Sequence, residues 1–362
     1  MESALKTAFP FIVPAIGIIA AFGLVMMIVA YTVLAERKVL GWIQGRVGPN
    51  RVGPWGILQP FADLLKFILK EDLVPDKSTK FVYFLAPMVA LTCALLPIVV
   101  YPFGPVITTI DWSFLPFGLG DGITRLPLTI ASIDVGVLFV LGITSVGVYG
   151  IALAGWSSNS KYSLMGGLRS SAQMISYELA MGASILGVVM LAGTLDLSGI
   201  IEAQTKSPFR WFIIPQFIGF VVFLIAAFAE TNRVPFDLPE AETELVAGFH
   251  TEYSALKFAL FFMAEYVNMF TVSVMCTVLF LGGWYVPGLS RLFEVGSIPY
   301  ALVSHIVFIG KICAFLFFYI WVRGTLPRFR FDQLMNFGWK FLLPVALGNV
   351  ILTIVLVYFL NS

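Results

Sequence analysis

The sequence predicts an all-α integral membrane protein with eight transmembrane helices and one amphipathic interfacial helix. Of its 362 residues, 59% are hydrophobic and only 12% are charged, whereas about a quarter of the residues in a soluble domain are charged. Apolar stretches of roughly 20 residues, the length that crosses the hydrocarbon core, recur along the chain. No stretch alternates with the period of two that a barrel strand requires. We expect one membrane domain, residues 1–362, with spans near 9–34, 82–103, 128–155, 172–192, 211–230, 258–282, 300–322 and 341–360.

Basic residues predict the orientation, because short inner loops are enriched in Lys and Arg. With eight spans, sixteen of the 22 basic residues fall in loops on one side, five fall on the other, and Lys311 lies within a span. The richer side is predicted to be the inner side, so both termini face outward. The outer loop at 103–127, rich in Pro and Gly, is expected to carry no chemistry.

Composition also excludes several classes of site. The net charge of +1 gives no reason to expect nucleic acid as a partner. Cys93, Cys276 and Cys313 lie in apolar segments without a CxxC pair, so neither an iron–sulfur cluster nor a disulfide framework is expected. With only two histidines, the chain is expected to hold no redox centre and no metal. The N-terminus lacks the features of a secretory signal, so we expect no cleaved signal peptide.

The first inner loop combines tight turns with basic residues. Gly-Pro pairs at 48–49 and 53–54 fix turns between residues that include Arg37, Arg46 and Arg51. Residues 57–71 are too short to span and carry polar side chains at helical spacing, which predicts the amphipathic interfacial helix. Positive-inside charge explains part of this loop, but a rigid basic loop also suits docking of another protein or the mouth of a cavity. The inner loop at 323–335 repeats the pattern.

An acid-rich loop lies between two apolar segments. Its carboxylic acids are Glu230, Asp237, Glu240, Glu242, Glu244 and Glu252. Asp237 and Glu240 fit the start of a helix as cap and capping-box partner, and Arg233 could neutralise Glu230 or Asp237. Glu240 and Glu244 would share a helix face, where like charges repel and hold a proton ready to move. We therefore expect Glu244 to be functional.

Three ionisable residues fall within predicted spans, where a charge costs roughly 2.5–3.5 kcal/mol. Glu178 and Glu265 each lie about seven residues from the inner end of a span, or roughly 10 Å deep. Lys311 lies near the middle of another. One alternative is a Glu–Lys pair that only joins two helices; the other is a hydrated chain of acids leading into the membrane from the acid-rich loop. Asp134 fits a helix cap equally well. The aromatic residues beside Glu265 suit packing or a cavity for an apolar ligand.

Several long motifs together identify a resemblance. They are ERKVLGWIQGRVGPN with LQPFADLLK (36–66), GWSSNSKYSLMGGLRSSAQMISYE (155–178), ETNRVPFDLPEAETELVAGFHTEYS (230–254), FFMAEY (261–266) and PRFRFDQLM (327–335). The chain resembles, over nearly its whole length, membrane subunit 1 (the H-type subunit) of respiratory complex I, NADH:quinone oxidoreductase. The outer loop at 103–126 is longer than the resemblance leads us to expect.

The resemblance implies a role in coupling quinone reduction to proton translocation. It implies that the chain binds no cofactor, that quinone is the substrate, and that flavin and iron–sulfur clusters reside in partner subunits. The residues implied along the quinone passage are Arg37, Arg46, Asp63, Arg233, Phe261, Phe262, Tyr266 and Arg330. The residues implied along the proton path are Glu178, Glu230, Asp237, Glu240, Glu242, Glu244, Glu265 and Lys311.

The implied partners are the other membrane-arm subunits, the peripheral quinone-reducing subunits, quinone and lipid, in a bacterial inner membrane. Two alternatives remain open. A membrane subunit of an energy-converting hydrogenase-like complex shares ancestry with this family, although the complete ETNRVPFDLPE and QPFADLLK motifs favour the quinone-linked branch. A cation–proton antiporter would also use buried acids and a lysine, but many antiporters have internal repeats, and none is found here.

Overall fold

The structure, a computed structural model, describes residues 2–108, 128–207, 211–237 and 246–361. The regular elements in these ranges are helices, which confirms the predicted all-α class. The longer helices are α1 (Glu2–Ile43), α2 (Gln59–Leu69), α3 (Lys80–Leu95), α4 (Gly136–Ser157), α5 (Lys161–Ala192), α6 (Leu197–Lys206), α7 (Phe217–Glu230), α9 (Ala255–Phe280), α10 (Ile298–Thr325), α11 (Phe331–Phe337) and α12 (Leu343–Asn361). Short helical turns are η1 (Pro54–Gly56), η2 (Leu96–Val100), η5 (Gly248–His250), η6 (Leu289–Arg291) and η7 (Gly338–Leu342).

Seven helical segments in the described ranges are long and apolar enough to cross a membrane, and one shorter apolar helix accompanies them. The shorter one is α7, in the span expected at 211–230. It has 14 residues, about 21 Å at 1.5 Å per residue, so it is shorter than the roughly 30 Å hydrocarbon core. The turns before α7 are held by protein, since the Ile213 amide donates to the Phe280 carbonyl at 3.0 Å. Non-helical backbone is tolerated at such depth where protein satisfies it.

Helix α5 begins at Lys161 rather than near residue 172, where the hydropathy pattern predicts its start. Its first turns carry small residues that allow close packing. A Cβ on Gly167 would lie 3.2 Å from the Cα of Gly155 in α4, and one on Gly166 would lie 2.7 Å from the Cα of Gly248. Small residues at helix contacts let backbones approach closely within membranes. The turn that contains Gly248 is therefore held directly against α5.

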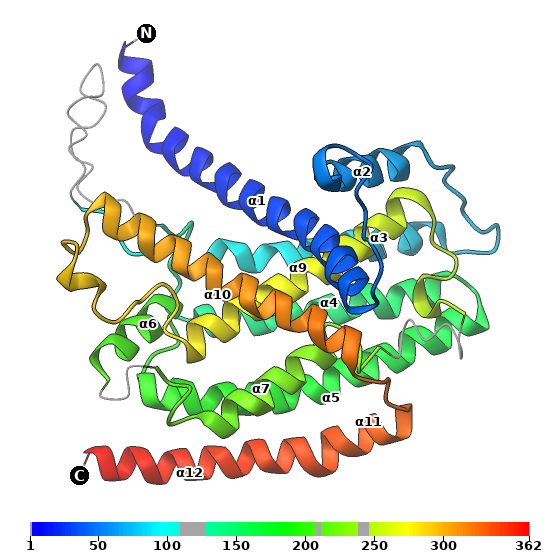
Figure 1. Ribbon diagram of the computed structural model, residues 1–362. Coiled ribbons are helices and arrows are strands. Elements are labelled where there is room, and N and C mark those ends of the chain that lie inside the picture. The colour runs from blue at the N-terminus through cyan, green and yellow to red at the C-terminus, as the bar shows by residue number, and fades with distance from the viewer. Residues whose placement is uncertain (1, 109–127, 208–210, 238–245, 362) are drawn as a thin grey trace.

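Helix α9 lies at the centre of the bundle and brings the charged residues together. Figure 1 shows α9 between α3 and α10, with α1 crossing the bundle diagonally and α12 running beside α5 and α7. Most α9 side chains are buried, including Val267, Val274 and Leu279. Two consecutive α9 residues, Glu265 and Tyr266, therefore face other helices of the bundle.

A buried polar contact joins α12 to the bundle. Gln216 donates to Thr353 at 2.6 Å and accepts from Asn349 at 2.8 Å. Gly187 of α5 and Gly219 of α7 leave room for these amides, because a Cβ at either position would lie within about 3 Å of them. Hydrogen bonds between polar side chains of neighbouring helices contribute on the order of 0.6–2 kcal/mol in membranes.

Candidate functional site

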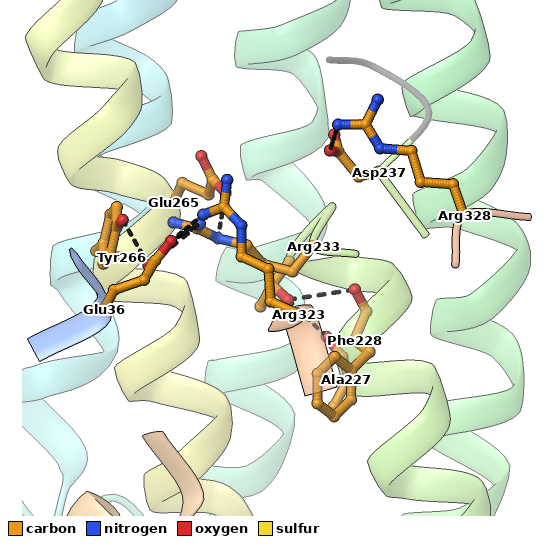
Figure 2. Close-up of polar contacts among 10 residues, drawn as sticks. Glu36, Ala227, Phe228, Arg233, Asp237, Glu265, Tyr266, Arg323 and Arg328 are labelled. Atoms are coloured by element: carbon orange, nitrogen blue, oxygen red, sulfur yellow. Dashed lines mark hydrogen bonds and ion pairs between the residues drawn. The ribbon is translucent and has the colours of Figure 1, made fainter. Parts of the chain in front are cut away.

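A buried cluster of charged side chains joins α1, α9, α10 and the turn after α7. Figure 2 shows Glu36, Arg233, Glu265, Tyr266 and Arg323 directed toward one another. Arg233 lies 2.5 Å from Glu265, Nε to Oε1, and 3.4 Å from Glu36, Nη1 to Oε1. Tyr266 donates to Glu36 at 2.7 Å, and Arg323 forms an ion pair with the same carboxylate. Residues widely separated in sequence thus meet at one point.

The cluster is electrically balanced, with two guanidinium groups and two carboxylates. Only 5% of Arg233 and 6% of Glu36 is exposed, so neither charge is solvated by bulk water. Burial alone would lower the pKa of Arg233, but Glu265, Tyr266 and Glu36 raise it well above its ordinary value. Arg233 also lies over the Tyr266 ring at 4.2 Å, a favourable cation–π contact. Arg233 is therefore a permanent positive charge to which the nearby carboxylates respond.

The expected neutralisation of Glu230 or Asp237 by Arg233 gives way to different pairings. Arg233 pairs with Glu36 and Glu265, whereas Asp237 accepts from Arg328 at 2.9 Å. The physical reason is the turn after α7, in which Asn232 has φ 51 and Arg233 faces α9. The predicted helix start at Asp237 continues into residues outside the described ranges, as do Glu240, Glu242 and Glu244.

A second polar group lies deeper, between α4, α5 and α7. Ser145 of α4 donates to the carboxylate of Glu178 in α5. Glu230, the last residue of α7, lies within reach of Thr144 and of the field of Glu178. Only 7% of Glu230 is exposed, and its Oε2 atom has no hydrogen-bond partner in the structure. A buried carboxylate oxygen without a partner is costly unless water or a proton occupies it.

One cavity connects the two polar groups. It has a volume of about 60 Å³ and is lined by both Glu230 and Glu265. Liquid water occupies about 30 Å³ per molecule, so the cavity has room for on the order of two waters. Its lining also includes His250, Phe261 and Phe262. A smaller cavity of about 10 Å³ lies on the other side of Glu230, beside Thr271. Water in the larger cavity could join the two carboxylates by hydrogen bonds.

The remaining residues predicted for the quinone passage do not all reach this cluster. Arg37 forms an ion pair with Asp63 at 2.7 Å, which joins the end of α1 to the amphipathic helix α2. Arg46 is exposed and donates to Gln44 at 2.8 Å. Arg330 is exposed near Asp332, 3.5 Å away, at the start of α11. Phe261, Phe262 and Tyr266 are near the cavity or in the cluster, so the structure separates an inner group from a peripheral group.

Lys311 lies apart from the acids. Its ammonium donates to three backbone carbonyls, those of Leu281 and Gly283 at 2.8 Å and of Tyr285 at 3.2 Å. An ammonium has three N–H groups, so these carbonyls account for all of them. Among the residues that the structure describes, no carboxylate pairs with Lys311, so the Glu–Lys pair considered as an alternative is not found there.

Sequence reasoning missed three residues at this site: Glu36, Arg323 and His250. Glu36 opens the ERK motif, and an acid at the inner end of a span beside two basic residues was a signal for it. Arg323 was interpreted only as inner-loop charge. His250 was counted only as one of two histidines. No group of three or more His, Cys, Asp or Glu suited to a metal ion occurs in the part of the chain that the structure describes.

Comparison with known proteins gives a consistent result. The sequence profile of the NADH dehydrogenase family matches residues 16–354. The chain is 54% identical over 346 residues to NADH-quinone oxidoreductase H-type subunit 2 of Koribacter versatilis, covering 94% of this chain and 96% of that protein. It is 51% identical to NADH-quinone oxidoreductase subunit 8 of Rhodothermus marinus, covering 88% and 90%. It is also 51% identical to the H-type NADH-quinone oxidoreductase subunit of Leptospira biflexa, covering 92% and 91%.

Proposed function

This chain belongs to the NADH dehydrogenase family, and on that premise we propose that it is the H-type membrane subunit of a proton-translocating NADH:quinone oxidoreductase. In this proposal it forms the membrane entrance and part of the wall of the quinone chamber. It couples quinone reduction to proton movement through its carboxylates. The names of its relatives support the complex, and the arrangement of charges supports the coupling role.

The observation that carries the proposal is the double position of Glu265. This carboxylate forms an ion pair with Arg233 and also lines the cavity that Glu230 lines. A group in that position responds to charge at the cluster and can pass a proton to cavity water. Glu178 extends the same line into α5 through its contact with Ser145.

The chemistry follows from charge. Quinone reduction takes up two electrons and two protons, and the electrons come from partner subunits. Negative charge developing at the quinone disfavours ionised carboxylates nearby, so it favours protonation of Glu265. Protonated Glu265 releases Arg233, which keeps its contacts with Glu36 and the Tyr266 ring. The proton then passes through cavity water to Glu230 and on toward Glu178.

Arg37 and Asp63 have a different part in the proposal. Their ion pair positions α2, whose exposed apolar face includes Phe61, Leu65 and Leu69. Such a face suits the lipid interface and the isoprenoid tail of a quinone. We place the quinone entrance along α2, with the aromatic residues of α9 behind it.

Replacement of Glu265 by glutamine in the assembled complex tests the proposal. Glutamine keeps the size and hydrogen bonding of the side chain but cannot release a proton. We expect the quinone-reductase rate to fall by at least about tenfold, while NADH oxidation by an artificial acceptor stays unchanged. The control is Glu202→Gln, because Glu202 lies exposed on α6. Wild-type coupled turnover in assembled Glu265→Gln complex would refute the role of Glu265.

A further inference from the structure

The short turn η5 places a histidine at the cavity. This turn follows the acid-rich loop and precedes α9, and its middle is held against α5 by the contact of Gly166 with Gly248. Thr251 donates its hydroxyl to the Gly248 carbonyl at 2.7 Å, and the Tyr253 amide donates to the His250 carbonyl at 3.0 Å. Both bonds close the turn on itself. The position of His250 is therefore set by backbone contacts.

The imidazole ring packs among aromatic rings at the edge of the cavity. Its centroid lies 4.9 Å from that of Phe249 and 5.4 Å from that of Phe258, both in edge-on geometry. His250 is partly exposed and belongs to the cavity lining together with Glu230 and Glu265. One side of the ring thus contacts apolar groups, and the residue also borders space that water can fill.

The other residues around the cavity supply few groups that can exchange protons. Titratable lining groups besides His250 are Glu265 from α9, Glu230 from α7 and Cys93 from α3. Helices α4 and α5 contribute Thr144 and Met174, which do not titrate. Histidine is the side chain whose unperturbed charge change falls between pH 5 and 8. Among the described lining residues, His250 is therefore the group suited to exchange protons with both bulk water and a carboxylate near neutral pH.

We propose that His250 carries protons between the water at the predicted inner surface and the carboxylates of the cavity. One ring nitrogen accepts a proton from water, and the other nitrogen donates its proton to cavity water and then to Glu265 or Glu230. The ring returns to a neutral form after each transfer, and no other bond changes. This inference rests on the proposed proton path and adds the residue through which that path is supplied.

Two replacements of His250 in the assembled complex test the inference. His250→Asn keeps hydrogen bonding but cannot be protonated in this pH range, and His250→Ala leaves space for added imidazole. We expect both to lower the quinone-reductase rate by about tenfold or more and to alter its pH profile between about pH 5 and 8. We expect free imidazole to restore part of the rate to His250→Ala. NADH oxidation by an artificial acceptor should stay normal.

The second histidine supplies a matched control. His305 bonds the Phe103 carbonyl through Nδ1 at 2.8 Å and is not part of the cavity lining. His305→Asn should leave the rate and the pH profile at wild-type values.

The outcomes separate the two proposals. A wild-type rate and pH profile in His250→Asn would overturn the inference. So would a lowered rate with an unchanged pH profile and no rescue by imidazole, because that result indicates a purely structural role. If Glu265→Gln is impaired while His250→Asn is normal, only the histidine inference fails. If both variants are normal, the proposed proton path fails as well.

Discussion

Arg233 lies between two consecutive residues of α9, with Nε 2.5 Å from Oε1 of Glu265 and the guanidinium 4.2 Å above the ring of Tyr266. Helix α9 thus holds the arginine that the turn after α7 supplies. The same guanidinium reaches Glu36 of α1, so three separate parts of the chain depend on one positive charge. Any change in the charge of Glu265 acts on all three.

Removal of Arg233 is expected to destabilise the protein strongly. In Arg233→Met, Glu36 and Glu265 lose a buried counter-charge, and breaking a buried pair in this way costs about 3–5 kcal/mol. The thermal midpoint of the solubilised complex should fall clearly. Adding Glu265→Gln to Arg233→Met should recover part of the loss, because the uncompensated carboxylate is then absent. A double variant no more stable than the single one would argue against the Arg233–Glu265 pair.

The hydroxyl of Tyr266 can be tested separately from its ring. Tyr266→Phe removes the bond to Glu36 at 2.7 Å but keeps the ring beneath Arg233. A hydrogen bond to a charged group contributes about 1.5–3 kcal/mol, so a modest drop in the thermal midpoint is expected. Tyr266→Leu, which also removes the cation–π contact, should lower the midpoint further. Equal midpoints for the two variants would mean that the ring contributes nothing.

The sequence predicts the helices well because lipid leaves the backbone few alternatives. Apolar length places α1, α3, α4, α9, α10 and α12 near their observed positions, and helical spacing finds α2. It does not predict the short α7, because hydropathy does not distinguish a helix from bonded turns within an apolar stretch. It misses the early start of α5 because Gly166 and Gly167 look unsuited to a helix until their neighbours are known.

The charged cluster is only partly predictable for a different reason. The motifs point to Glu265, Arg233 and Tyr266, but Glu36 and Arg323 are 287 residues apart in sequence. No local pattern indicates that such residues meet. The cavity that joins Glu230 to Glu265 likewise depends on how α3, α4, α7 and α9 pack, and not on any one of them alone.

The ion pair between Arg37 and Asp63 should matter more for position than for stability. Both groups are partly exposed, and such pairs contribute roughly 0–1 kcal/mol. Asp63→Asn should therefore leave the thermal midpoint almost unchanged. It should raise the KM for quinone, because α2 is then less firmly joined to α1 at the proposed entrance. The exchanged pair, Arg37→Asp with Asp63→Arg, should recover the KM, and an unchanged KM in Asp63→Asn would count against this placement of the entrance.

Lys311 distinguishes a proton carrier from an anchor. The resemblance places it on the proton path, whereas its three carbonyl contacts hold the turn at the outer end of α9, where Gly282 and Gly283 both have positive φ. Lys311→Met leaves those carbonyls without their donor, and each bond to a charged group contributes about 1.5–3 kcal/mol. We expect the thermal midpoint to fall in Lys311→Met while the ratio of protons moved to NADH oxidised, measured in proteoliposomes, stays at the wild-type value. Lys311→Gln, which keeps a donor, should lose less stability. A lowered proton ratio with an unchanged midpoint would instead support transfer of protons through Lys311, because an anchor that does not exchange protons affects the fold before it affects the stoichiometry.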